Sequence, residues 1–194
     1  MMLPTPKNNA VAAAITVLVF LFSWGLFNTC NAARANDSDP IVFNFENTEG
    51  PHYEKIETFL QYYFRTCNPR KLNNARTILT DVVDISESEN VNPYLIAAII
   101  RHESSWNQTA RGALGEAGLM QVNNLPIQIT EKWTIRDQIT RGIRMLLDSY
   151  ARCGSVLGAV SYYATGKSCR VYKGARIRVK LAQRIEQGFY NDKI

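Results

Sequence analysis

Residues 92–107 of this chain read Asn-Pro-Tyr-Leu-Ile-Ala-Ala-Ile-Ile-Arg-His-Glu-Ser-Ser-Trp-Asn and decide its fold. Asn92 is of a type that caps helices, and Pro93 suits the first helical position because its missing N–H would have no partner there. The residues that follow are apolar up to an Arg-His-Glu end, so we expect a central, buried helix that runs to about Ser105. Its single acid, Glu103, falls at the edge of the apolar face.

Glu103 has the surroundings that a general acid needs. Desolvation and the negative end of the helix dipole both disfavour a charged carboxylate, so this group should keep its proton to higher pH than an exposed glutamate. That property suits cleavage of a glycosidic bond. From position alone, the more ordinary interpretation is a surface glutamate in the last helical turn, paired with Arg101 or Arg111.

Helical periodicity extends over most of the chain, because apolar side chains recur at three- and four-residue steps. The helices expected besides the one from Pro93 cover residues 53–66, 72–89, 135–150, 156–164 and 174–187. Residues 112–124 contain three glycines and should form a loop or a broken helix. No segment shows sustained strand alternation, so the expected fold class is mainly α.

The N-terminus has the order of a secretory signal peptide. Lys7 precedes an uncharged apolar run at residues 10–27, and the small-residue site Ala33-Arg34-Ala35 follows. The expected division of the chain is a signal peptide at 1–35, an exposed leader at 36–51 and one domain at 52–194. The apolar run is also long enough to span a membrane, so an uncleaved N-terminal anchor is the alternative. Either way, the folded part would lie outside the cytoplasm, as in the periplasm.

The composition is that of a globular protein with a mild basic excess. Hydrophobic residues make up 46% of the 194 residues, and loss of residues 1–35 would lower the net charge from +5 to +3. This excess fits an anionic polymer as partner but does not require one. The most basic segment, Arg170–Arg184, is expected to be a solvated helix face, and a patch facing a wall polymer or a membrane is the alternative.

Three cysteines follow the signal segment: Cys67, Cys153 and Cys169. An oxidising compartment would permit one disulfide and leave one thiol. Cys153 and Cys169 would close the shorter loop, and a pair that includes Cys67 remains open. The chain has only two histidines, and no cysteine–histidine spacing is typical of a metal site, so no metal is expected.

The helix end and the glycines after it belong to a longer pattern. The matching residues are Glu103-Ser104-Ser105-Trp106-Asn107, Ala110, Gly115, Gly118-Leu119-Met120-Gln121-Val122, Gln138-Ile139, Gly142, Met145-Leu146 and Tyr163-Ala164-Thr165-Gly166. In kind and spacing they resemble the soluble lytic transglycosylase family, which has the lysozyme fold. The resemblance covers about residues 78–166 and leaves out the first helix and the basic tail.

The resemblance implies a role for each matched residue. Glu103 corresponds to the catalytic acid and base, and Ser104 to the neighbour that helps to position substrate. The segment Gly118–Gln121 would line the groove beside the scissile bond, and Tyr163 resembles the tyrosine that reaches towards the glutamate. The implied substrate-binding residues are Ser104, Gly118, Leu119, Met120, Gln121 and Tyr163. No cofactor and no metal are implied.

Four positions depart from the family pattern: Gln108 replaces proline, Gly112 serine, Glu116 alanine and Ala164 asparagine. The change at Ala164 removes a polar group near the groove. Glu116 could be a second carboxylate that favours hydrolysis, since ordinary glycosidases use two. A solvated loop residue at a variable position is the simpler interpretation, which we favour.

The function implied is a peptidoglycan lytic transglycosylase. It would cleave the β-1,4 bond between N-acetylmuramic acid and N-acetylglucosamine and leave 1,6-anhydro ends. The same fold also suits a goose-type-like lysozyme, which hydrolyses that bond, or a non-catalytic wall-binding component of a secretion, conjugation or pilus machine. The expected partner is the glycan strand, with no nucleic acid and with membrane contact only through an uncleaved N-terminal segment.

Overall fold

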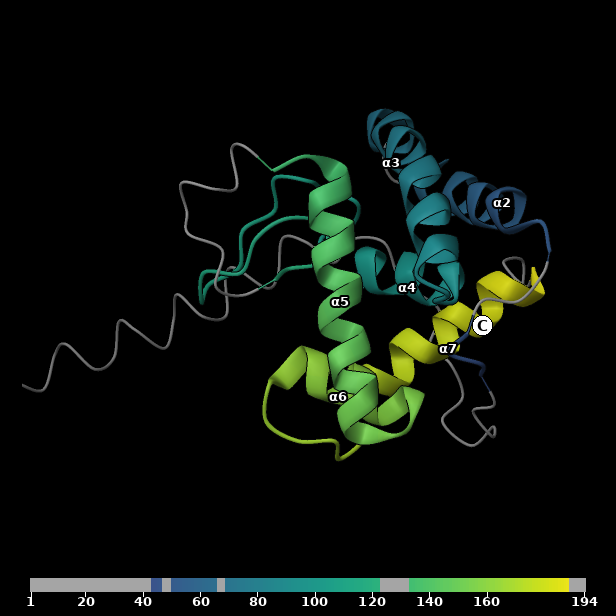
Figure 1. The fold of residues 1–194 in the computed structure, drawn as a ribbon. Coiled ribbons are helices and arrows are strands. Elements are labelled where there is room, and N and C mark those ends of the chain that lie inside the picture. The colour runs from purple at the N-terminus through teal and green to yellow at the C-terminus, as the bar shows by residue number, and fades with distance from the viewer. Residues whose placement is uncertain (1–42, 47–49, 66–68, 123–132, 189–194) are drawn as a thin grey trace, which may run out of the picture. The chain divides into compact units, whose positions relative to one another are not determined.

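Six helices and no strand make up the part of the chain that the structure describes. This computed structural model describes residues 43–46, 50–65, 69–122 and 133–188. The helices, labelled in Figure 1, are α2 (His52–Arg65), α3 (Pro69–Ser88), α4 (Pro93–Glu103), α5 (Ile135–Cys153), α6 (Val156–Thr165) and α7 (Lys173–Gln187). The expected mainly α class is confirmed.

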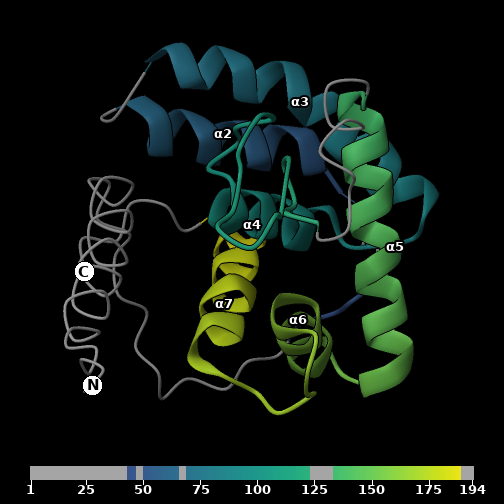
Figure 2. The same ribbon diagram turned by 90° about the vertical axis from the view of Figure 1, so that its left-hand side faces the viewer.

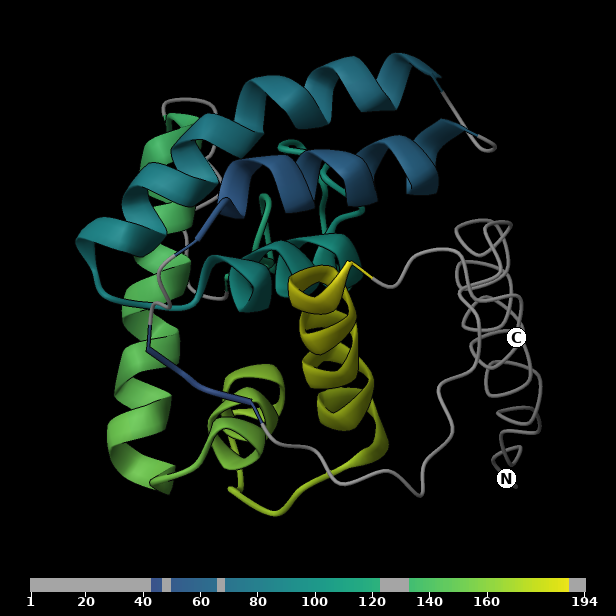
Figure 3. The same ribbon diagram turned by 90° about the vertical axis from the view of Figure 1, so that its right-hand side faces the viewer.

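Helix α4 is the centre of the core. The Oδ1 atom of Asn92 accepts hydrogen bonds from the backbone N–H groups of Tyr94 (3.0 Å) and Leu95 (3.3 Å), as the sequence predicts for an N-cap. Every residue from Pro93 to Ile100 is buried. Helices α2 and α3 lie side by side above α4, and α7 packs against it from below (Figures 2 and 3). Because α4 is enclosed in this way, the position of Glu103 at its end is fixed relative to the core.

The helix boundaries follow local chemistry. Helix α5 begins with a capping box, in which the Thr134 hydroxyl accepts from the Asp137 N–H and the Asp137 carboxylate accepts from the Thr134 N–H. Helices α5 and α6 both end at a left-handed glycine, Gly154 and Gly166. The observed ends lie within three residues of the predicted ones, and the loop expected at 112–124 contains no helix over its described residues.

A disulfide joins the end of α5 to the segment after α6. Cys153 and Cys169 are bonded, with their Cα atoms 5.5 Å apart, which selects one of the pairings that the sequence left open. Gly158, in the first turn of α6, lies so close that an added Cβ would come within 3.0 Å of the Cys153 Cβ. Cys67 lies outside the described residues.

The leader expected to be exposed is in part a core element. Phe45 is buried, its ring stacks on Tyr150 with centroids 4.0 Å apart, and its carbonyl accepts from the Asn92 N–H at 2.9 Å. The expectation of exposure is therefore wrong for Phe45, because an aromatic ring and a backbone acceptor there complete the start of α4.

The expected signal segment at residues 1–35 lies outside the described residues. Within the described ranges, no helix is both long and apolar enough to cross a bilayer.

We expect the double variant Cys153→Ser/Cys169→Ser to lose about 3 kcal/mol of unfolding free energy, because the bond closes a loop with a sequence separation of 16 residues. Urea denaturation followed by circular dichroism measures the loss. The wild-type protein under reducing conditions is the control and should show a similar midpoint. An unchanged midpoint in both samples would contradict a stabilising role.

Candidate functional site

Glu103 is the last residue of α4, and the chain turns sharply after it. Ser104 closes the helix through its N–H and its hydroxyl, which both donate to the Ile100 carbonyl at 3.1 Å. Ser105 and Trp106 then adopt left-handed φ angles of 50° and 63°. Such angles are costly for a residue as large as tryptophan, but Trp106 is buried in the core and is held there by packing. Backbone in the left-handed region thus begins two residues after the candidate catalytic residue.

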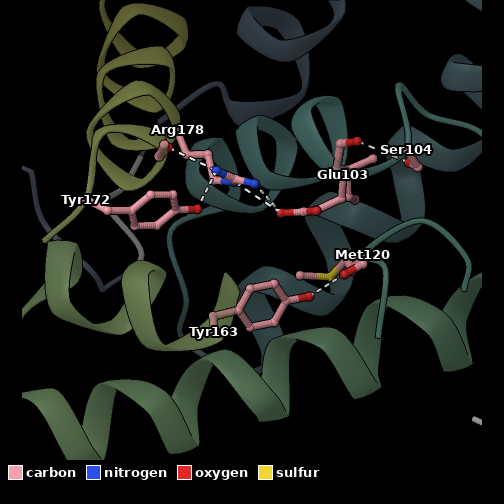
Figure 4. Close-up of polar contacts among 8 residues, drawn as sticks. Glu103, Ser104, Met120, Tyr163, Tyr172 and Arg178 are labelled. Carbon is pink, nitrogen blue, oxygen red and sulfur yellow. Dashed lines mark hydrogen bonds and ion pairs between the residues drawn. The ribbon is translucent and has the colours of Figure 1, made fainter. Parts of the chain in front are cut away.

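The Glu103 carboxylate is paired with Arg178 from α7 (Figure 4). Both Nη2 (2.7 Å) and Nε (3.1 Å) of Arg178 donate to the same oxygen, Oε1. The two side chains are 10% and 17% exposed, for Arg178 and Glu103 respectively, so little water competes for these bonds. A guanidinium at this distance favours the charged carboxylate, opposite to the two effects that the sequence suggested.

Arg178 is itself fixed from the other side. Its Nη1 donates to the Tyr172 hydroxyl and to the Gly174 carbonyl, both at 3.0 Å. The Tyr172 ring can reach this position only because residue 174 has no side chain: a Cβ on Gly174 would lie 2.4 Å from the ring. The guanidinium therefore has one orientation, aimed at Glu103.

The segment Gly118–Gln121 docks on α5 through two close approaches. Gly118 has a φ of 79°, and a Cβ there would lie 2.5 Å from the Oε1 atom of Gln138, which accepts the Leu119 N–H at 2.9 Å. Gly142 leaves room for Met120, whose Sδ would lie 2.3 Å from an added Cβ. The first segment of the sequence pattern (Glu103–Val122) and the second (Gln138–Leu146) thus pack against each other.

Tyr163, from the third segment, joins the same contact. Its hydroxyl donates to the backbone carbonyl of Met120 at 2.5 Å (Figure 4). Burial and the nearby charge of Glu103 both raise the pKa of Tyr163 above its ordinary value, so the phenol stays neutral. The tyrosine expected to reach towards Glu103 therefore lies near it and hydrogen-bonds the Gly118–Gln121 segment.

The remaining predicted substrate contacts are placed as follows. The side chains of Leu119 and Met120 have no exposed surface, so in this state they pack the core. The Gln121 amide donates to the carbonyls of Ala110 (3.2 Å) and Gly118 (2.9 Å) and thereby holds the loop closed. Roles in binding substrate for these residues, and for Ser104, stay predictions.

Two of the departures from the family pattern touch each other. Oε2 of Glu116 accepts the Leu114 N–H at 3.0 Å, and a Cβ on Gly112 would lie 2.2 Å from that oxygen. The glutamate at 116 therefore fills the space that a side chain at 112 would occupy. Its carboxylate braces its own loop, which is a more specific role than the solvated residue that we favoured.

Sequence reasoning missed Arg178, although a signal was present. The buried residues of α7 include Ala175, Val179 and Ala182, and Arg178 falls on the same three- and four-residue spacing. A charged residue at a core position needs a buried partner. The expectation of a solvated basic face is thus wrong for Arg178 and for Lys180, which are each only 8% exposed.

Within the described ranges, no three His, Cys, Asp or Glu side chains gather as a metal site. The expectation of a reaction without metal or cofactor stays a prediction.

Comparison with protein families gives one finding. The family described as "Transglycosylase SLT domain" matches residues 83–180, about half of the chain. This match reaches beyond the resemblance seen in the sequence and includes Arg178 in the basic tail. Comparisons with curated proteins and with solved structures gave no match.

We expect Gly118→Ala to destabilise the protein more than Gly115→Ala, a matched control. Both glycines have positive φ, 79° and 90°, so both variants lose about 1–2 kcal/mol to backbone strain. Only at Gly118 does the new Cβ also meet Gln138 and disturb a buried hydrogen bond, for roughly 1–3 kcal/mol more. Urea denaturation of both variants measures the difference. Equal losses would mean that the Gln138 contact is easily replaced.

Proposed function

Because the chain belongs to the transglycosylase SLT domain family, of the lysozyme-like superfamily, we propose that it is a peptidoglycan lytic transglycosylase with Glu103 as its single acid and base. Family membership indicates a transglycosylase-type action on peptidoglycan. The finer assignment rests on one observation: a glutamate at the end of the buried central helix, beside the Gly118–Gln121 segment and Tyr163.

The proposed reaction balances without added water. Protonated Glu103 donates its proton to the glycosidic oxygen as the bond from the anomeric carbon of N-acetylmuramic acid breaks. The resulting carboxylate then takes the proton of the same sugar's 6-hydroxyl, whose oxygen bonds to the anomeric carbon. The products are a free N-acetylglucosamine hydroxyl and a 1,6-anhydro end, and Glu103 is protonated again.

Glu116 is the candidate for a second carboxylate, which in hydrolysis would act as a nucleophile or activate water. Its Oε2 accepts the N–H of Leu114 within its own loop, which gives this carboxylate a structural role. The transglycosylase needs no second carboxylate, so the mass of the products and the Glu116→Ala variant distinguish it from the goose-type-like lysozyme, which would use water.

The test compares the wild-type protein with Glu103→Gln on isolated sacculi. Glutamine keeps an acceptor for Arg178 and so preserves the packing, but it cannot exchange a proton. We expect release of muropeptides to fall at least about 100-fold, as for loss of a general acid. Mass spectrometry of the wild-type products should show ends lighter by one water than hydrolysed ends.

Each alternative gives a different result. Products of hydrolysed mass would identify a lysozyme, and binding of sacculi without release of muropeptides would identify a wall-binding module. Equal activity in Glu103→Gln and wild type would remove Glu103 from the reaction. Glu116→Ala, as a second variant, should leave product mass unchanged if its carboxylate only braces the loop.

We also propose that the domain acts outside the cytoplasm, exported by residues 1–35. The apolar run and the Ala33-Arg34-Ala35 site support export, and so does the Cys153–Cys169 disulfide, since such bonds persist in oxidising compartments.

The mass of the protein recovered from the producing cell's envelope checks this proposal. We expect a species that begins at residue 36, since signal peptidases cut after an A-x-A site. An intact N-terminus in the membrane fraction would identify an anchor, and recovery only from the cytoplasm would contradict export.

A further inference from the structure

The ion pair between α4 and α7 assigns Arg178 a part in the chemistry. We propose that Arg178 is the positioning residue of the catalytic carboxylate: it holds Oε1, leaves Oε2 to give and take the proton, and sets the pH at which that proton is lost. The inference rests on the proposed role of Glu103 as acid and base, and extends it to a residue from a different helix.

The geometry makes the two carboxylate oxygens unequal. Oε1 of Glu103 accepts two N–H groups of Arg178, at 2.7 Å and 3.1 Å. No described residue donates to Oε2. A proton added to Oε1 would compete with two charge-assisted donors, so it binds to Oε2. The ion pair with Arg178 therefore determines that Oε2 is the oxygen that brings the proton to the glycosidic bond.

Arg178 is held firmly enough to keep its donors on Oε1. Four of its N–H groups are used: two on Glu103, one on the Tyr172 hydroxyl and one on the Gly174 carbonyl. Its helix, α7, packs against α4, so the guanidinium cannot leave Glu103 without breaking bonds at both of its ends. A side chain fixed in this way orients the carboxylate before substrate arrives.

Two ionisable groups beside Glu103, Tyr163 and His102, are neutral near neutral pH. Tyr163, from α6, has its pKa raised by burial and by the charge of Glu103. His102, on α4 itself, has its pKa lowered to about 4 by burial and by the charges of Arg178 and Arg101. Tyr172 is a phenol that accepts from Arg178. Arg178 is therefore the cation in direct contact with the carboxylate.

Arg101 of α4 and several charged groups on α2, α3 and α5 have partners other than Glu103. Arg101 stacks on the Tyr63 ring of α2, 3.7 Å from its centroid, and donates to Ser105. On α3, Arg76 is paired with Glu57 of α2, and Asp81 with Arg136 of α5. None of these pairs includes Glu103.

The sign of the effect follows from the reaction. A neighbouring cation favours the carboxylate, so Glu103 loses its proton at a lower pH with Arg178 present than without it. The first step needs the proton on Glu103, so activity falls on the alkaline side as the proton is lost. Removal of the Arg178 charge should move this alkaline limb of the pH–activity profile to higher pH.

The experiment measures kcat/KM against pH on soluble peptidoglycan strands for the full-length protein. In Arg178→Gln we expect the alkaline limb to rise by roughly 1–3 pH units, and in Arg178→Lys, which keeps the charge, by less. Arg176→Gln is the matched control, because it removes the same charge from the exposed face of the same helix and should leave the limb in place. Circular dichroism checks that each variant is folded.

A second readout does not depend on activity. Carbon-13 NMR of glutamate carboxyl groups, with the Glu103 signal assigned by its loss in Glu103→Gln, follows protonation directly. The midpoint of this signal should rise in Arg178→Gln and stay unchanged in Arg176→Gln. If midpoint and limb stay in place while activity falls equally at every pH, Arg178 is structural only and the inference is overturned. If the wild type releases no muropeptides, the proposed function fails, and the midpoint still shows whether Arg178 controls Glu103.

Discussion

The contact between Met120 and Gly142 organises the site, because it places the glycine-rich segment on α5. With any side chain at residue 142, the sulfur of Met120 could not take its present position, and Gly118–Gln121 would have to move. Gln138 and Tyr163 then hold the same segment by hydrogen bonds to its backbone. The three separated parts of the sequence pattern are therefore one packing unit.

The chemistry of Glu103 results from opposing effects at one carboxylate. Exposure of only 17% and the helix dipole disfavour charge, while the guanidinium of Arg178, 2.7 Å away, favours it. The arginine also makes the two carboxylate oxygens different, because both of its N–H groups that reach Glu103 donate to Oε1.

Local patterns predicted the helices well, because each helix carries its own apolar stripe, cap or terminal glycine. Asn92, Gly154 and Gly166 lie at helix ends for reasons that their own chemistry supplies. The same reasoning was wrong for Phe45 and Arg178. A short polar segment gives no local sign that one of its aromatic rings, that of Phe45, stacks on Tyr150, and a basic helix gives little sign of which cation faces inward.

The sequence by itself determined the mainly α class, the buried helix that ends at Glu103 and, by its spaced pattern, the family and the candidate catalytic residue. These depend on neighbours along the chain or on residue types at fixed separations. Only the tertiary structure decided the Cys153–Cys169 pairing, the role of Glu116 as a loop brace and the partner of Glu103. Arg178 lies 75 residues from Glu103, and their carboxylate–guanidinium contact exists only because α7 packs against α4.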